Sequence, residues 1–296
     1  MNTARRLRFS AAVLFTLAAT LCGTAAAASG PKPIPLPPLA SIDDLAWAPL
    51  AGGKLLITTD GNGSFTVLDG DGKPSGQDFL PLTRVRDLRV LTDGSIVAGD
   101  ARTGRVYHVA ANGKMLGTGG ARGLAKGEFL QLDRVEIDSK GRLYGLDGSE
   151  LRVLQFSHEG ELLGTFQIES GPIVDAKDRL LAVMERPSDG TRQVVAFTAP
   201  GKPEVLYQGR AAGGSRWEPV AALSGGEVLL RSIDVLGKTS LQTLGVDGKL
   251  GAEVKLAEDA VLAGPSRVAA MEPAGKLLYY LAGKPGGYRV ERIQLP

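Results

Sequence analysis

Residues 133–147 read DRVEIDSKGRLYGLD, and residues 148–166 continue with GSELRVLQFSHEGELLGTF. Apolar and polar residues alternate within each short stretch, and the polar turns between the stretches contain Gly141 and Gly160. Alternation with a period of two, bounded by glycine turns, is typical of short antiparallel strands. This segment therefore predicts four consecutive strands joined by tight turns.

The same pattern recurs along the chain. The second predicted strand of the first three units ends at Asp60, Asp100 and Asp147, which are 40 and 47 residues apart. Five turns between third and fourth strands contain a glycine, and these glycines are spaced by 41, 47, 41 and 47 residues: Gly72, Gly113, Gly160, Gly201 and Gly248. Six units of four short strands predict an all-β fold, a six-bladed β-propeller of four-stranded antiparallel blades.

The sixth unit stops after three strands, because residues 268–283 and 288–295 bring the sequence to Pro296. We expect the N-terminal strand within 30–40, GPKPIPLPPLA, to complete the last blade as its outermost strand, where proline is tolerated. Residues 173–186 and 252–263 are also compatible with helix. The repeat favours strands for 173–186 and leaves a helical turn open for 252–263.

The first 28 residues have the pattern of a cleaved secretory signal peptide. Three arginines precede an uncharged apolar run at 11–21, which is too short to span a membrane, and small residues follow up to Ala28. Cleavage there removes three basic residues and no acidic one, so the net charge changes from +2 to −1. We therefore expect a single propeller domain over 29–296 that is periplasmic or secreted and has no membrane span.

Composition narrows the class of function. The chain has 34 basic and 32 acidic residues, and this balance argues against a nucleic-acid partner. The single cysteine, Cys22, lies in the predicted signal peptide, so we expect no disulfide and no thiolate chemistry in the mature chain. The 40 glycines are about twice the ordinary share, which indicates many tight turns.

Residues 127–166 resemble an NHL repeat. The pattern of that family includes a first strand with valine and aspartate, a Gly-Arg-Leu-Tyr stretch and an aspartate before a turn. The matching residues are Val135, Asp138, Gly141, Arg142, Leu143, Tyr144, Asp147, Arg152, Val153, Phe156, Gly160, Leu163 and Phe166. The first two units match moderately, and the last three keep only the spacing. The resemblance implies a six-bladed propeller and no single activity.

The sequence offers few candidates for catalysis. Asp60, Asp100 and Asp147 precede turns, and we interpret them as side chains that accept hydrogen bonds from turn N–H groups. Calcium-dependent lactonases with a similar fold use two asparagines near the axis, and amidating lyases of similar architecture hold zinc with three histidines. This chain has only His108 and His158, which the repeat places in a strand and a turn. We predict no catalytic residue, metal or cofactor.

The loops that enter the innermost strands surround one mouth of a propeller channel, and here they carry charges of both signs. We predict that this mouth binds a ligand or partner through Asp44, Arg86, Asp87, Arg134, Arg216, Trp217, Glu218 and Arg267. The alternative is that these acids and bases pair with one another. Trp217 either anchors a partner or fills space between blades.

We expect a non-catalytic, extracytoplasmic binding module, a scaffold for protein–protein interaction whose partner is another extracytoplasmic protein. One alternative is a metal-assisted hydrolase or lyase of the lactonase type. Another is a binder of envelope polysaccharide that uses Trp217 and the adjacent pair Tyr279 and Tyr280, one of which could be exposed. The sequence leaves open whether the protein is an enzyme.

Overall fold

The computed structural model describes most of the chain after the predicted signal peptide. The described residues are 31–39, 42–43, 45–59, 64–79, 82–186, 188–209, 216–233, 239–261, 269–272 and 277–295, with the side chains at 77–79 and 216 left aside. The predicted signal peptide, Asp44, Asp60 and Arg267 lie outside these residues.

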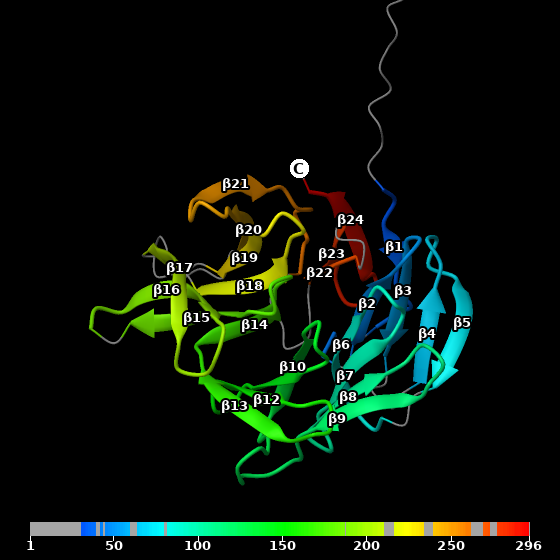
Figure 1. Cartoon of the computed structure of the whole chain (residues 1–296). Coiled ribbons are helices and arrows are strands. Elements are labelled where there is room, and N and C mark those ends of the chain that lie inside the picture. Colours follow the sequence, from blue (N-terminus) through cyan, green and yellow to red (C-terminus); the bar gives the residue numbers. More distant parts are fainter. Residues whose placement is uncertain are drawn as a thin grey trace, which may run out of the picture.

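Six four-stranded antiparallel sheets form the ring of a β-propeller, which confirms the predicted fold (Figure 1). Five blades take four consecutive strands each, and the sixth combines the last three strands with the first. Blades 1 to 3 are β2 (Ala46–Leu50), β3 (Lys54–Thr58), β4 (Ser64–Leu68), β5 (Pro74–Phe79); β6 (Val85–Val90), β7 (Ile96–Asp100), β8 (Arg105–Val109), β9 (Met115–Gly119); and β10 (Leu132–Ile137), β11 (Leu143–Asp147), β12 (Arg152–Phe156), β13 (Leu162–Gln167). Blades 4 to 6 are β14 (Ser170–Val174), β15 (Leu180–Arg186), β16 (Thr191–Phe197), β17 (Pro203–Gly209); β18 (Arg216–Ala222), β19 (Val228–Ile233), β20 (Thr239–Leu244), β21 (Leu250–Val254); and β22 (Ala269–Met271), β23 (Leu277–Ala282), β24 (Arg289–Gln294), β1 (Ile34–Pro35).

The turns between third and fourth strands lie where the sequence predicts them. All five glycines there have a positive φ between 72° and 93°, a conformation that side chains with a Cβ rarely adopt. Residues 173–186, for which helix was the alternative, are divided between β14 and β15. Residues 252–254 belong to β21, and a short turn follows at 258–259.

The hydrophobic core is divided among the six interfaces between neighbouring blades. Each cluster of buried side chains combines residues from two adjacent sheets, such as Val97 of blade 2 with Val135 of blade 3. Leucine, valine, isoleucine and alanine dominate these clusters, with a few aromatic rings, including Phe129 and Phe156 at 5.9 Å. The twisted sheets therefore stabilise the ring through face-to-face burial of aliphatic side chains.

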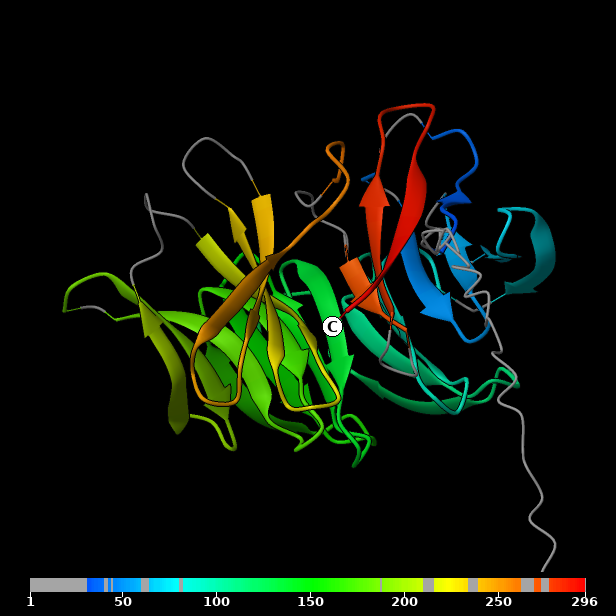
Figure 2. The same cartoon turned by 90° about the horizontal axis from the view of Figure 1, so that it is seen from above.

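The N-terminal strand closes the ring, as predicted. Ile34 of β1 pairs with Val290 of β24, and the Leu36 N–H donates to the Tyr288 carbonyl at 3.1 Å. The Ile34 side chain is fully buried, in the cluster between blades 6 and 1. Figures 1 and 2 show the first and last strands together in one blade. The two ends of the described chain are thus held in one sheet, and β24 has no exposed edge along this pairing.

Candidate functional site: the channel and its two mouths

The six innermost strands, β2, β6, β10, β14, β18 and β22, surround the axis of the ring. We call the mouth at which these strands begin the N-terminal mouth, and the mouth at which they end the C-terminal mouth. Six of the eight predicted binding residues belong to the part of the chain that the structure describes. They occupy the first half of the innermost strands and so lie at the N-terminal mouth or just inside it: Arg86, Asp87, Arg134, Arg216, Trp217 and Glu218.

Arg86 of β6 links the loop before β2 to the start of β10 at the N-terminal mouth. Its Nη1 donates to the Asp43 carbonyl at 3.2 Å, and its Nε lies 3.6 Å from Oδ1 of Asp133. Gln131 holds the same carboxylate, with Nε2 at 2.8 and 3.0 Å from its two oxygens. Burial raises the pKa of the Asp133 carboxyl above its ordinary value. Arg86 and Asp133 therefore form a partly exposed polar rim whose side chains are held in place.

A chain of three charged groups crosses the channel below this rim. Arg134 of blade 3 reaches past blade 4 to form an ion pair with Glu218 of blade 5. The other carboxylate oxygen of Glu218 pairs with Arg231, which lies opposite it on β19. All three side chains are at most 13% exposed. One carboxylate thus serves two guanidinium groups, and the network links blades 3 and 5 within the channel on the side of the N-terminal mouth.

Asp87, Trp217 and Arg216 belong neither to the rim pair of Arg86 and Asp133 nor to the network around Glu218. Asp87 is buried and accepts a hydrogen bond from the Val135 N–H at 3.0 Å, so it joins blade 2 to blade 3. Trp217 is only 6% exposed and its ring centroid lies 5.0 Å from that of Tyr207. Of the two interpretations of Trp217, the structure therefore shows the packing one. Arg216 starts β18.

The expectation that one ring of the pair Tyr279 and Tyr280 is exposed is corrected. Tyr279 is fully buried and Tyr280 is 5% exposed, so neither side chain of the pair is presented to solvent. The Tyr280 hydroxyl accepts a hydrogen bond from the Ala257 N–H at 3.1 Å. The two rings do face opposite sides of β23, but both sides are covered, because blade 1 packs on one and blade 5 on the other.

Of the three aspartates at the repeat position, Asp100 accepts hydrogen bonds from its own turn, as interpreted, whereas Asp147 accepts them from another loop and Asp60 lies outside the described residues. Asp100 accepts from the N–H groups of Arg102 and Thr103 in its own turn, and from Thr83 in the loop that leads into β6. Asp147 accepts from the Leu130 and Gln131 N–H groups and pairs with Arg152. Both carboxylates therefore anchor a loop of the N-terminal mouth, and Asp100 also holds its own turn.

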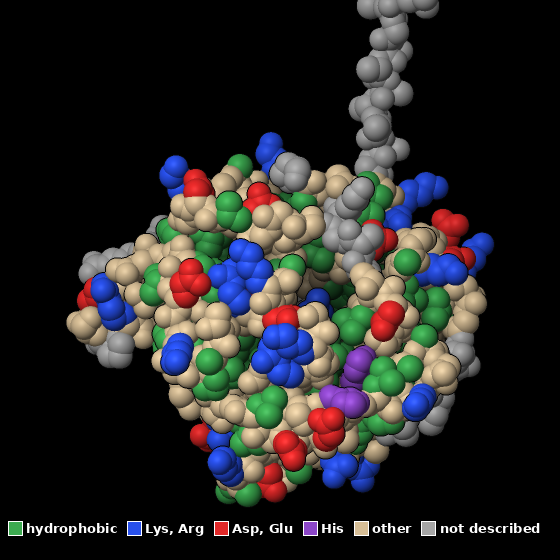
Figure 3. All heavy atoms as spheres, in the orientation of Figure 1, with side chains coloured by type: hydrophobic (Ala, Val, Ile, Leu, Met, Phe, Trp, Pro, Cys, Tyr) green, Lys and Arg blue, Asp and Glu red, His purple; other side chains and the backbone are tan. Residues whose placement is uncertain are grey.

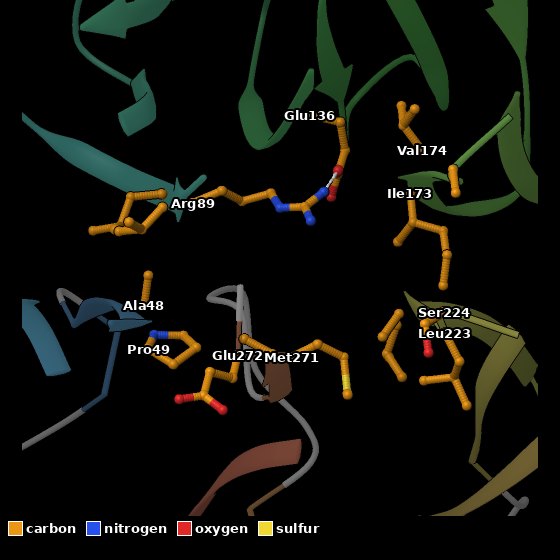
Figure 4. Close-up of a pocket in the computed structure, with 17 residues that line it drawn as sticks. Ala48, Pro49, Arg89, Glu136, Ile173, Val174, Leu223, Ser224, Met271 and Glu272 are labelled. Carbon is orange, nitrogen blue, oxygen red and sulfur yellow. Dashed lines mark hydrogen bonds and ion pairs between the residues drawn. The ribbon is translucent and has the colours of Figure 1, made fainter. Parts of the chain in front are cut away.

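The C-terminal half of the channel contains a cavity of about 260 Å³, lined by residues from all six blades. Arg89 of β6 pairs with Glu136 of β10, whose side chain is completely buried (Figure 4). Ile173, Leu223 and Met271 form an apolar part of the wall. The channel thus contains a cavity toward the C-terminal mouth and a network of charged side chains from blades 3 and 5 toward the N-terminal mouth.

The two histidines lie near each other, at the ends of blades 2 and 3 on the side of the C-terminal mouth. His108 Nε2 is 3.0 Å from the Ser95 hydroxyl, and burial lowers the pKa of its imidazole below the ordinary value. His158 lies in the turn between β12 and β13 and interacts electrostatically with His108. Figure 3 shows the histidines together on the face with the central hollow, which is therefore the C-terminal mouth.

Within the described ranges, no three histidine, cysteine or acidic side chains are grouped as metal ligands. No helix among the described residues is long and apolar enough to cross a membrane.

The sequence interpretation missed Arg89, Glu136 and Arg231. The sequence feature that could have identified such residues is a charged residue within an otherwise apolar strand, as in VEI at 135–137 and LLRS at 229–232.

No protein-family model and no curated protein matches this sequence. Solved structures do match. Streptogramin B lyase superimposes with a TM-score of 0.53 at 10% identity, over 88% of this chain and 97% of that one. Virginiamycin B lyase from Staphylococcus aureus gives a TM-score of 0.53 at 12% identity, over 90% and 99%. The chain is a six-bladed propeller structurally like virginiamycin B lyase.

This likeness concerns the fold. A chain of the mitotic checkpoint complex superimposes equally well, with a TM-score of 0.54 at 13% identity over 97% of this chain and 99% of that one. Propellers with unrelated roles therefore share this arrangement, and a role for this chain has to be argued from its own side chains.

Proposed function

We propose that this protein is a non-catalytic, extracytoplasmic binding module with NHL-like blades, which binds a partner protein at the N-terminal mouth of its channel. The observation that carries the proposal is the Arg134–Glu218–Arg231 network across the channel. Because charged side chains occupy this side of the channel, we infer that the N-terminal mouth presents a polar surface rather than a deep apolar pocket, and such a surface suits a protein better than a small molecule.

The acidic side chains near the axis support a binding role over metal-assisted hydrolysis. Glu218 and Glu136 are each engaged by arginine, and Asp87 accepts a backbone hydrogen bond. Any of these three carboxylates would first have to leave its partner to act in catalysis or bind a metal, and Glu272 of the channel cavity belongs to no group of three metal-binding side chains among the described residues. The rim of Arg86 and Asp133, held by Asp43 and Gln131, offers instead a pre-organised pattern of charges for recognition.

The structural likeness to virginiamycin B lyase does not by itself support a lyase activity for this protein. A histidine-to-alanine variant of virginiamycin B lyase, solved with quinupristin, is catalytically inactive. In this chain the two histidines lie on blades 2 and 3, and His108 is engaged with Ser95. The observed burial of Trp217, Tyr279 and Tyr280 likewise gives less support to a polysaccharide site built on those rings.

Affinity capture from the native extracytoplasmic fraction tests this proposal, with residues 29–296 as bait. The informative variant combines Arg86→Ala with Asp133→Ala, because it removes both members of the rim pair and leaves the packed Trp217 untouched. Glu253→Gln, on the exposed outer strand of blade 5, is the matched control. We expect one partner that is retained by the wild type and control and lost by the double variant. Equal capture by all three proteins, or capture by none, would contradict the proposal.

A further inference from the structure

Two neighbouring cavities on the face of the C-terminal mouth form a second candidate binding surface. The first is the channel cavity described above. The second, of about 440 Å³, lies between the first hairpins of blades 2 and 3 and includes Asp93, His108 and Ser139 in its wall. Arg89 and Val90 line both cavities, so the two share a wall.

The charges of this surface are unbalanced. Four acidic side chains and one basic side chain line the two cavities. Arg89 neutralises Glu136, and Arg142, which lies outside the lining, neutralises Asp138. Two carboxylates, Glu272 in the first cavity and Asp93 in the second, form no ion pair with any residue that the structure describes. The lining of each cavity therefore contains one carboxylate that no lining or neighbouring arginine of the described chain neutralises.

The local surroundings keep these carboxylates available to a ligand. Asp93 is exposed, and hydrogen bonds from the Ser95 hydroxyl and N–H hold the pKa of its carboxyl below the ordinary value. Its neighbour His108 is kept neutral near pH 7 by burial, so it does not compensate the charge. Glu272 is half-buried, across the cavity from the Arg89–Glu136 pair (Figure 4).

The apolar wall of the channel cavity complements this charge pattern. Ile173, Leu223 and Met271 would contact the methylene groups of a lysine or arginine side chain while its charged end meets a carboxylate. A second basic residue of the same segment would meet Asp93 in the adjoining cavity. In an extended peptide, alternate side chains point to the same side, so one chain can supply both.

We propose that the C-terminal mouth binds an extended, basic peptide segment of a partner, with one basic side chain in the channel cavity near Glu272 and another near Asp93. This site is separate from the N-terminal mouth and goes beyond the binding role proposed there. The two proposals therefore fail independently, since the double variant at Arg86 and Asp133 leaves this face intact.

Fluorescence polarisation with three labelled octapeptides of alternating sequence tests the proposal. Alanine alternates with lysine in the first, with glutamine in the second and with glutamate in the third. We expect saturable binding of the lysine peptide alone. We expect Glu272→Gln and Asp93→Asn each to weaken it by about two- to fivefold, as removal of one partly screened charge pair should. Glu150→Gln, an exposed charge in the turn between β11 and β12 on the opposite face, is the matched control.

Several outcomes would overturn the proposal. One is equal binding of the lysine and glutamine peptides. A second is an equal loss of affinity in Glu150→Gln, because it would indicate attraction to the net charge of the protein. A third is displacement by free spermidine at the same concentration as by unlabelled lysine peptide, because it would indicate a site for small amines. The melting temperature of each variant confirms that the fold is intact.

Discussion

Replacing Asp100 by alanine tests how the loops of the N-terminal mouth are held. The Asp100 side chain is almost fully buried, and its Oδ2 accepts hydrogen bonds from both N and Oγ1 of Thr83 at 2.8 Å. Its Oδ1 accepts from the N–H groups of Arg102 at 2.9 Å and Thr103 at 3.2 Å. One carboxylate therefore ties the loop before β6 to the turn after β7.

The expected loss follows from the donors left behind. A buried donor that loses its acceptor costs about 1–3 kcal/mol, and water can reach some of these donors because Thr83 and Arg102 are exposed residues. We expect Asp100→Ala to lower the free energy of unfolding by about 3–4 kcal/mol, a large part of the 5–15 kcal/mol typical of a domain. Asp100→Asn keeps one acceptor oxygen and should lose about 1–2 kcal/mol.

Urea unfolding measures these values, with Asp71→Ala as control. Asp71 is an exposed turn residue, and its replacement should change stability by less than about 0.5 kcal/mol. A loss below about 1 kcal/mol for Asp100→Ala would refute the reasoning, because the four hydrogen bonds would then contribute little beyond those to water.

The pH dependence of the same variants gives a second check. Burial alone would raise the pKa of the Asp100 carboxyl, but the hydrogen bonds from Thr83, Thr103 and Arg102 outweigh it and keep the pKa below 3.8. The ionised form therefore stabilises the fold at pH values above 3.8, and this stabilisation is lost as the pH falls through the folded-state pKa. The stability difference between wild type and Asp100→Asn should shrink in that range. A difference that stays constant would contradict the assignment.

Three further changes test other parts of the structure. Ile34→Ala should lower the free energy of unfolding by about 2–4 kcal/mol in urea titrations, since Ile34 is fully buried in the closing blade; a loss below about 1 kcal/mol would mean that β1 does not close the ring. In the same measurement, Glu218→Ala should destabilise the protein more than Arg134→Ala. Loss of Glu218 removes the carboxylate that pairs with two guanidinium groups, whereas loss of Arg134 leaves the pair of Glu218 with Arg231. The reverse order would contradict the network. His108→Gln should reduce the fall in melting temperature between pH 7 and pH 5. Burial lowers the pKa of His108 in the folded protein, so the neutral imidazole stabilises the fold and this stabilisation is lost as the pH falls below 6.5. An unchanged fall would argue against the buried imidazole.

The architecture was predictable because it depends on local patterns that repeat. A glycine such as Gly160 marks a turn through its own backbone conformation, whatever the rest of the chain does. The closing strand was also predictable, because a unit with three strands needs a fourth and residues 30–40 were available. Both inferences need only the count and spacing of strands.

The channel was less predictable, because contacts there join blades that are distant in sequence. Nothing in the sequence near Arg134 indicates that it reaches Glu218, since the pair depends on the radius of the ring and the length of both side chains. Trp217 is ambiguous for the same reason, because its burial is decided by Tyr207 in the neighbouring blade. Glu136 and Glu272 lie in innermost strands or directly after them, and only the closed ring shows that they share a cavity.

Hydrogen exchange of the protein with and without its captured partner tests the central claim most directly. If the partner binds at the N-terminal mouth, the amides of residues 84–87 and 131–134 should become protected, since these segments carry the rim around Arg86 and Asp133. Outer strands such as β17 and β21 should exchange as before. Protection confined to the outer strands, with no change at 84–87 and 131–134, would contradict the claim.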